Sequence, residues 1–177
     1  MTERAAGGGV RVLGIDPGTR VVGFGVVDLR GGAICHVVHG TVRAPRDEPL
    51  PARLATIRAG LEQVLRSQAP AVVVLEGLFY ARNVKSVLTL AHARGVALEV
   101  AASFELPVME YSPMELKRSL VGYGRATKLQ VARMVQRLLG LADEPSPDAG
   151  DALALAICHL HADRLRSLRG AAMRRSR

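Results

Sequence analysis

The stretch VRVLGID, Val10 to Asp16, decides the fold of this chain, because it is an apolar, β-rich run that ends in an acid before a Pro17-Gly18 turn. Two further β-rich runs follow after tight turns, Val21 to Asp28 and Ala33 to Arg43. Short runs joined in this way indicate an antiparallel meander. The run AVVVLE, Ala71 to Glu76, is almost purely apolar, which is typical of a strand covered on both faces. The sequence therefore predicts an α/β fold.

The rest of the chain supplies helices and one more strand. Apolar residues at helical spacing and capping signals predict the helices. Three helices are expected at Arg53–Gln68, Asn83–Ala102 and Pro113–Leu120. A fourth helix is expected to begin at Thr127 with Gln130 as its reciprocal cap, and a fifth to run from Ser146-Pro147 to about Arg166. The last strand is expected at Leu106–Tyr111. This order indicates a central mixed five-stranded sheet flanked by helices. We expect one domain over residues 10–163, a flexible lead at residues 1–9 and a basic, disordered tail at residues 164–177.

Composition narrows the class of protein. The chain has 177 residues, 49% of them hydrophobic, which is enough for a buried core and excludes a wholly disordered chain. No apolar run reaches the ~18 residues of a membrane helix, so no membrane partner is expected. Cys35 and Cys158 are far apart in the sequence. This usage predicts a cytoplasmic protein without a disulfide scaffold or a zinc finger.

Positive charge gathers in two places. The chain has 24 Lys and Arg against 16 Asp and Glu, a formal net charge of +8. One cluster is the arginine-rich end, residues 164–177. The other is residues 116–142, which contain no acid and six bases: Lys117, Arg118, Arg125, Lys128, Arg133 and Arg137. Such a one-signed surface attracts phosphates, although a solvated helix face has the same composition. We call residues 116–142 the basic window.

Four acids stand out by their positions. Asp16 and Glu76 each end a predicted strand, and parallel neighbours would bring both to one edge of the sheet. Asp148 and Asp151 are three residues apart in a predicted helix and so face the same way. Clustered carboxylates suit Mg²⁺, and two such ions can promote phosphodiester hydrolysis. Each acid also has a purely structural explanation, namely capping a turn, ending a strand in solvent, or complementing a helix dipole.

Longer motifs around these acids resemble the RuvC family of Holliday junction resolvases. They occur in the family's order over about Val10 to Ala162: Val12–Arg20 with Gly23-Phe24-Gly25, Leu75–Phe79 with Ala81-Arg82-Asn83, His92–Val96, and Pro147–Ala154. The resemblance implies a ribonuclease H-like fold and a homodimeric endonuclease that cuts two opposed strands of a four-way DNA junction symmetrically. It implies two Mg²⁺ or Mn²⁺ ions per site, held by the catalytic residues Asp16, Glu76, Asp148 and Asp151. The partners implied are junction DNA and the RuvA–RuvB branch-migration complex.

The resemblance also implies roles for basic residues. Lys117 and Lys128 match lysines that the family uses near the scissile phosphate, so both are candidates for catalysis and for DNA binding. Lys128 stands at the first position of a predicted helix, where its charge opposes the helix dipole and the backbone N–H groups attract anions. A solvated lysine is the alternative. Arg82 and Arg125 are expected to contact the DNA.

Aromatic and small residues complete the resemblance. Phe79 matches an aromatic that stacks on bases opened at the centre of the junction, and Tyr80 could share or replace that role. Either ring could instead belong to the core. The helix Asn83–Ala102 corresponds to the family's dimer helix, and Ala91 and Gly95 would let two copies approach closely.

Two other functions fit parts of the sequence. The Asp16–Gly18 turn also occurs in actin-like and sugar-kinase-like ATPases, which need a second phosphate loop and a second domain. The basic window alone would suit a protein that grips branched DNA without cutting it. Tight ATP binding would favour the first function. Junction affinity that ignores metal ions, with no product strands, would favour the second.

Overall fold

The computed structural model describes residues 9–77 and 84–175. The predicted DNA contacts Phe79, Tyr80 and Arg82 lie outside the described residues. Within the described ranges, no helix combines the length and the apolar character needed to cross a membrane.

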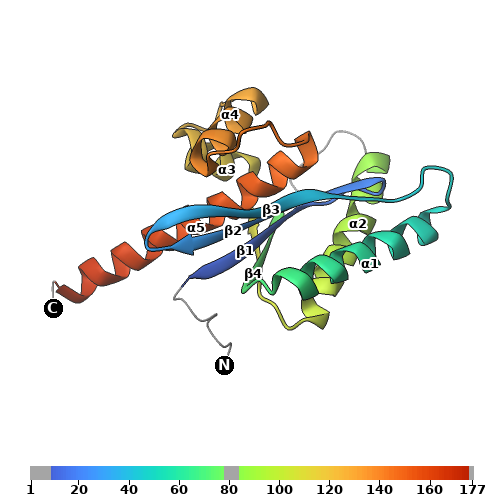
Figure 1. Ribbon diagram of the computed structural model, residues 1–177, viewed down its shortest axis with the longest axis horizontal. Helices are drawn as coiled ribbons and strands as arrows, with labels where there is room; N and C mark the ends of the chain where they lie inside the picture. Colours follow the sequence, from blue (N-terminus) through green and yellow to red (C-terminus); the bar gives the residue numbers. More distant parts are fainter. Residues whose placement is uncertain (1–8, 78–83, 176–177) are drawn as a thin grey trace.

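A mixed sheet of five strands forms the centre, in the order β3-β2-β1-β4-β5 (Figure 1). The first three strands form the predicted antiparallel meander, and the last two run parallel to the first. Their bounds are β1 (Val10–Asp16), β2 (Val21–Arg30), β3 (Ala33–Arg43), β4 (Val72–Glu76) and β5 (Val108–Tyr111). The five-stranded mixed sheet predicted from the sequence is confirmed.

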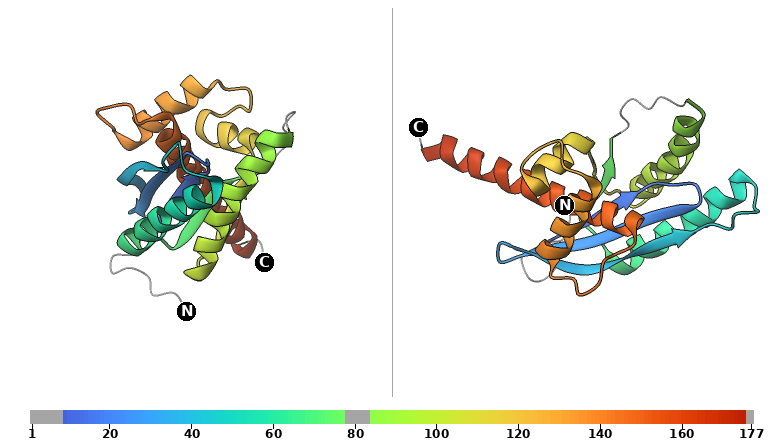
Figure 2. Two further views of the ribbon diagram at one scale, coloured as in Figure 1. Left: turned by 90° about the vertical axis from the view of Figure 1, so that its right-hand side faces the viewer. Right: turned by 90° about the horizontal axis from the view of Figure 1, so that it is seen from above.

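Helices cover both faces of this sheet, as Figures 1 and 2 show. One face carries α1 (Leu50–Gln68) and α2 (Val84–Ser103). The other face carries α5, and α3 and α4 pack on α5 from outside. The bounds of these three helices are α3 (Pro113–Val121), α4 (Lys128–Leu139) and α5 (Pro147–Arg175).

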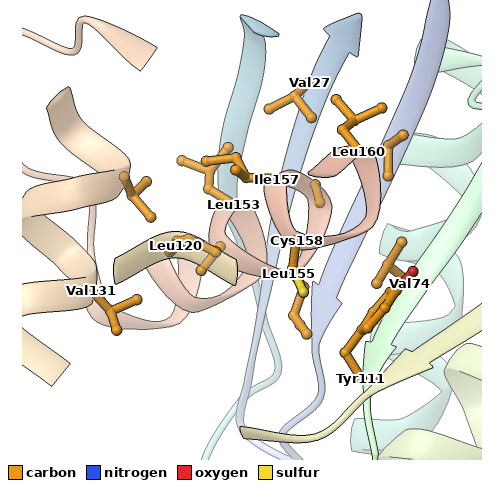
Figure 3. Close-up of a cluster of buried hydrophobic side chains, with 14 of the residues drawn as sticks. Val27, Val74, Tyr111, Leu120, Val131, Leu153, Leu155, Ile157, Cys158 and Leu160 are labelled. Atoms are coloured by element: carbon orange, nitrogen blue, oxygen red, sulfur yellow. The ribbon is translucent and has the colours of Figure 1, made fainter. Parts of the chain in front are cut away.

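The core lies in two layers, one on each side of the sheet. In β1, Val12 belongs to the layer under α5, and its neighbour Leu13 belongs to the layer under α1 and α2, because successive side chains of a strand point to opposite faces. Figure 3 shows the layer under α5, which includes Val27, Val74, Leu120, Leu153 and Ile157. β4 is buried from both sides, which explains its nearly continuous apolar run.

Two glycines let α5 lie unusually close to the sheet. A Cβ added to Gly14 would stand 1.9 Å from the carbonyl oxygen of Ala152, and one added to Gly23 would stand 2.0 Å from that of Asp148. Neither position therefore tolerates a side chain while α5 keeps its place. Gly150 lies inside α5 but makes no such close approach. Among the described residues, a Cβ added to Gly150 would meet Pro145 Cγ at the ordinary contact distance of 3.6 Å.

Several elements begin or end at other residues than predicted, among them α1, β5 and α5. α1 begins at Leu50 rather than Arg53, because Pro51 fits the first turn of a helix, where its missing N–H needs no partner. β5 begins at Val108, directly after Pro107, which cannot donate to the sheet. α5 continues to Arg175, beyond the predicted end near Arg166, so the structure describes residues 164–175 as helix where we expected a disordered tail. This segment contains no proline and is rich in good helix formers.

Candidate active site

The ends of two parallel strands place the first pair of carboxylates side by side. β1 and β4 are hydrogen-bonded neighbours with Ile15 opposite Leu75. Asp16 and Glu76 are each the next residue along, so both leave the sheet at the same edge. The predicted parallel pairing of these strands is therefore confirmed. Asp16 is half-buried, whereas Glu76 keeps part of its side chain open to solvent.

The first turn of α5 brings the second pair of carboxylates to this edge. Asp148 lies directly against Gly23, and Gly23 is paired with Asp16 in the antiparallel ladder of β1 and β2. Asp151 follows one turn later and lines a cavity together with Asp16 and Glu76. The close approach of α5 to the sheet is therefore what carries Asp148 and Asp151 to the strand ends.

Electrostatics show that the four carboxylates share one place. The pKa of Asp16 is raised to about 7, first by burial and then by the negative charges of Asp151, Glu76 and Asp148, with Lys128 acting in the opposite direction. Burial also raises the pKa of Glu76, and the charge of Asp151 adds to this rise. The sequence prediction that Asp16, Glu76, Asp148 and Asp151 converge agrees with this geometry.

The lysines of the basic window complete the cavity. Its volume is about 300 Å³, and its wall includes Lys117 from α3 and Lys128 from α4. Lys128 Nζ lies 3.2 Å from Asp151 Oδ2. Apolar side chains form the rest of the wall: Pro113, Leu116, Val131 and Leu155. Arg125 is exposed in the segment between α3 and α4 and does not line this cavity.

Helix caps hold the two lysines in place. Thr127 and Gln130 form the predicted reciprocal cap at the start of α4, with Thr127 Oγ1 accepting from the Gln130 N–H at 3.3 Å. Ser112 and Glu115 form the same arrangement at the start of α3, with Ser112 Oγ accepting from the Glu115 N–H at 3.1 Å. The spacing of Ser112 and Glu115 is a signal that the sequence analysis missed.

The donor set suits hard divalent cations by its chemistry, since carboxylate oxygens are the ligands that Mg²⁺ and Mn²⁺ prefer. Among residues 9–77 and 84–175, no three acidic, His or Cys side chains are arranged closely enough to hold a metal ion as they stand. Carboxylates that share a site repel one another, and this repulsion adds to burial in raising the pKa of Asp16. A cation placed among them would relieve it, so the residues fit a metal site.

A larger cavity lies elsewhere and has different chemistry. It measures about 500 Å³ and is lined by residues of α3, α5 and β5, among them Tyr111, Cys158 and Leu165. Its carboxylate, Glu115, is held by the cap at Ser112. Because this cavity lacks a group of acids, the smaller cavity at the strand ends is the candidate active site.

One residue near the site was missed altogether in the sequence analysis. Arg94 of α2 donates from Nη1 to the backbone carbonyl of Glu76 and pairs with Glu110 of β5. Its charge counteracts the rise in the pKa of Glu76. Arg94 lies within the His92–Val96 motif, but nothing in that local pattern indicates a contact with β4.

This sheet, with helices on both faces and acids at the adjoining ends of β1, β4 and α5, defines a ribonuclease H-like nuclease. A sequence profile described as "Crossover junction endodeoxyribonuclease RuvC" matches residues 12–159. The chain belongs to the RuvC family. A protein of that description from Syntrophotalea carbinolica is 47% identical over 159 residues, which cover 90% of this chain and 99% of that protein.

Further relatives agree with this assignment. A protein of the same description from Burkholderia multivorans is 48% identical over 152 residues, 86% of this chain and 84% of that protein. The structure of Thermus thermophilus RuvC in complex with Holliday junction substrate is similar with a TM-score of 0.83 and 35% identity, covering 88% of this chain and 96% of that one. The predicted family, fold and nuclease class are confirmed, and family membership favours a nuclease over both the ATPase-like module and the non-cutting binder.

Proposed function

We infer that this chain resolves Holliday junctions by metal-dependent hydrolysis of phosphodiesters on two opposed strands, in DNA recombination and repair. One observation carries the inference. Burial and the carboxylates that β4 and α5 place around Asp16 raise its pKa to about 7, in a cavity that also contains two lysines of the basic window. Crowded acids beside basic side chains suit a site that binds cations and phosphate together.

The mechanism assigns a separate task to each group. Asp16 and Glu76, with Asp148 and Asp151, would hold two Mg²⁺ or Mn²⁺ ions. Such ions, when bound, activate a water molecule and stabilise the leaving oxygen. Lys117 and Lys128 neutralise the charge that develops on the phosphate. In the free protein, Lys128 Nζ lies 3.2 Å from Asp151 Oδ2. This pair therefore links a residue assigned to phosphate binding with a residue assigned to metal binding.

Junction binding needs contacts beyond the cavity. Arg125 is exposed beside Lys117 and Lys128, where it would contact the DNA backbone. The resemblance assigns Arg82 to the same task and Phe79 or Tyr80 to stacking on junction bases. These contacts would orient the junction, whereas the carboxylates would cut it.

A homodimer would present two sites to the two equivalent strands of a junction. The exposed face of α2 supports this arrangement. A hollow of about 490 Å³ on that face is lined by Leu88, Ala91, His92 and Gly95 with two neighbours, and Leu88 is 57% exposed. Within the described residues, nothing apart from its chain neighbours and the backbone of α2 would lie within 4 Å of a Cβ added to Gly95, so this face is open to a second copy. We also propose that the protein acts in the cytoplasm together with the RuvA–RuvB complex.

A labelled synthetic four-way junction and a linear duplex of the same arms test this function. We expect paired, symmetric cuts in the junction alone, only with Mg²⁺ or Mn²⁺. Glu76→Gln should bind the junction and leave it uncut, while Glu105→Gln, which changes an exposed acid outside the site, should cut normally. Metal-independent binding without product strands, or equal cutting of the duplex, would contradict the proposal.

A further inference from the structure

Arg94 is a buried charge that neither the fold nor DNA binding explains. Only 6% of the residue is exposed, and the other buried polar or charged residues of the described structure are Asp28 and His159. A guanidinium is buried in this way only where protein groups replace its water. The partners of Arg94 therefore indicate what it does.

The two terminal nitrogens of Arg94 contact two different strands. Nη1 donates to the backbone carbonyl of Glu76, the last residue of β4. Nη2 lies 2.5 Å from Oε1 of Glu110 on β5. In the ladder between β4 and β5, Glu110 lies opposite Leu75, one residue before Glu76. The guanidinium thus joins α2 to the ends of both strands.

The carbonyl of Glu76 belongs to the backbone from which the side chain of Glu76 leaves the end of β4. The peptide bond is planar, so a carbonyl held by a fixed donor also holds the backbone dihedral of the residue that carries it. The Glu76 carboxylate lines the cavity shared with Asp16 and Lys128. A second hollow of about 180 Å³, lined in part by Asp16, Glu76 and Arg94, adjoins it. Arg94 therefore stands directly behind the acids.

Arg94 is unsuited to a direct contact with DNA. Its side chain is 8% exposed, whereas that of Lys128 is 88% exposed. Its charge is already paired with Glu110, which is 48% exposed and keeps its own access to water. A phosphate could not replace Glu110 without breaking the link between α2 and β5.

We propose that Arg94 is a positioning residue for the nuclease site: braced by Glu110, it holds the Glu76 carbonyl and so sets the direction in which the Glu76 carboxylate enters the acidic cavity. The inference rests on the proposed function, because it assumes that Glu76 works there. Arg94 also ties Glu76 to α2, the helix whose exposed face is the proposed dimer surface.

Four variants test this role. Arg94→Met removes both contacts, and Arg94→Lys keeps the charge but cannot reach both strands with one ammonium group. Glu110→Ala removes the brace at a half-exposed position. Arg58→Met is the matched control, because Arg58 on α1 also pairs with α2, through Glu99 at 3.1 Å, away from the site.

Three measurements apply to each full-length variant: Mn²⁺ binding to the free protein by calorimetry, junction affinity in EDTA, and the rate at which bound junction is cut. For Arg94→Met we expect Mn²⁺ binding and cutting to fall by about 10–100-fold, as for other groups that orient metal ligands. Junction affinity should change by less than about twofold, because phosphate contacts supply it. Arg94→Lys and Glu110→Ala should lie between Arg94→Met and the wild type, and Arg58→Met should match the wild type.

Wild-type Mn²⁺ binding and cutting in Arg94→Met would overturn the proposal. Equal losses in Arg58→Met at a matched drop in melting temperature would overturn it as well, because they would reduce Arg94 to a general stabiliser. If Arg94→Met does not fold, Glu110→Ala decides by the same measurements. If the wild type itself does not cut, or Glu76→Gln cuts as the wild type does, the proposed function fails instead, and the two failures are thereby distinguished.

Discussion

Replacing Asp16 with Asn should stabilise the protein while abolishing its activity. The pKa of Asp16 is raised from 3.8 to about 7 by burial and by three neighbouring carboxylates. At about 1.4 kcal/mol per pKa unit, a rise of about three units corresponds to an upper limit of ~4 kcal/mol. Asp16 is only half-buried, so water weakens the burial effect, and salt screens the neighbouring charges. We therefore expect Asp16→Asn to raise the free energy of unfolding by about 2 kcal/mol at pH 8 in EDTA. For a chain of this length, that is a rise in Tm of roughly 4–8 °C.

The sign of the effect follows from linkage. A carboxyl whose folded pKa lies above its unfolded pKa binds more protons in the folded state, so the wild type loses stability as pH rises from about 4 to about 7. Asn carries no such charge. The gain from Asp16→Asn should therefore be largest above pH 7 and fall by more than half between pH 8 and pH 5. Mg²⁺ should raise the Tm of the wild type more than that of the variant.

Asp28→Asn is the matched control, with the opposite sign. Hydrogen bonds from Arg11, with Nε 2.7 Å from Oδ1, and from Arg30 hold the pKa of Asp28 below its ordinary value. Asp28→Asn should lower the Tm at pH 8, and this loss should fade as pH falls through the folded pKa. Thermal unfolding by circular dichroism measures both variants, between pH 5 and pH 8 for Asp16→Asn and from pH 8 to below the ordinary pKa of 3.8 for Asp28→Asn. An Asp16→Asn protein no more stable than the wild type at pH 8 in EDTA would refute the crowding of charges at Asp16.

Two further substitutions test the lysine and the docking of α5. Lys128→Met removes the 3.2 Å contact with Asp151 and a charge that lowers the pKa of Asp16. We expect the cutting of bound junction to slow by about 100-fold and the pH of half-maximal cutting to rise, and we expect the salt slope of binding to fall by about 1. An unchanged cutting rate would remove Lys128 from the mechanism. Gly14→Ala would force a Cβ to 1.9 Å from the Ala152 carbonyl, so urea unfolding should report a loss of ~3 kcal/mol or more together with lost cutting. Gly150→Ala has room for its Cβ and should instead gain up to ~1 kcal/mol; equal losses in both variants would contradict the close docking of α5.

Local patterns in the sequence determined the elements of this fold. The meander follows from β-rich runs separated by turns, and the burial of β4 follows from its unbroken apolar run. The cap at Thr127 depends on residues three apart, so it too can be predicted without tertiary information. The same holds for the direction of the acids, because a residue that ends a parallel strand leaves the sheet at a known edge.

The ends of the elements were less predictable, for reasons of context. The predicted start of α1 at Arg53 leaves Pro51 outside the helix, although Pro51 is compatible with a first helical turn. At the other end of the chain, Arg166 reaches back to donate to the Tyr111 hydroxyl at 3.1 Å, a contact 55 residues away in sequence. No local pattern contains that partner.

The sequence by itself thus determined which residues are acids, at which strand ends Asp16 and Glu76 lie, and which family the chain resembles. Tertiary structure alone decided that the pKa of Asp16 rises to about 7, that Lys128 pairs with Asp151, and that Arg94 holds the carbonyl of Glu76. The reason is physical: a pKa shift or a buried contact depends on the distance between groups that the chain separates widely. The distances from Asp16 to the two acids of α5 exist only once Gly14 and Gly23 have let α5 close onto the sheet.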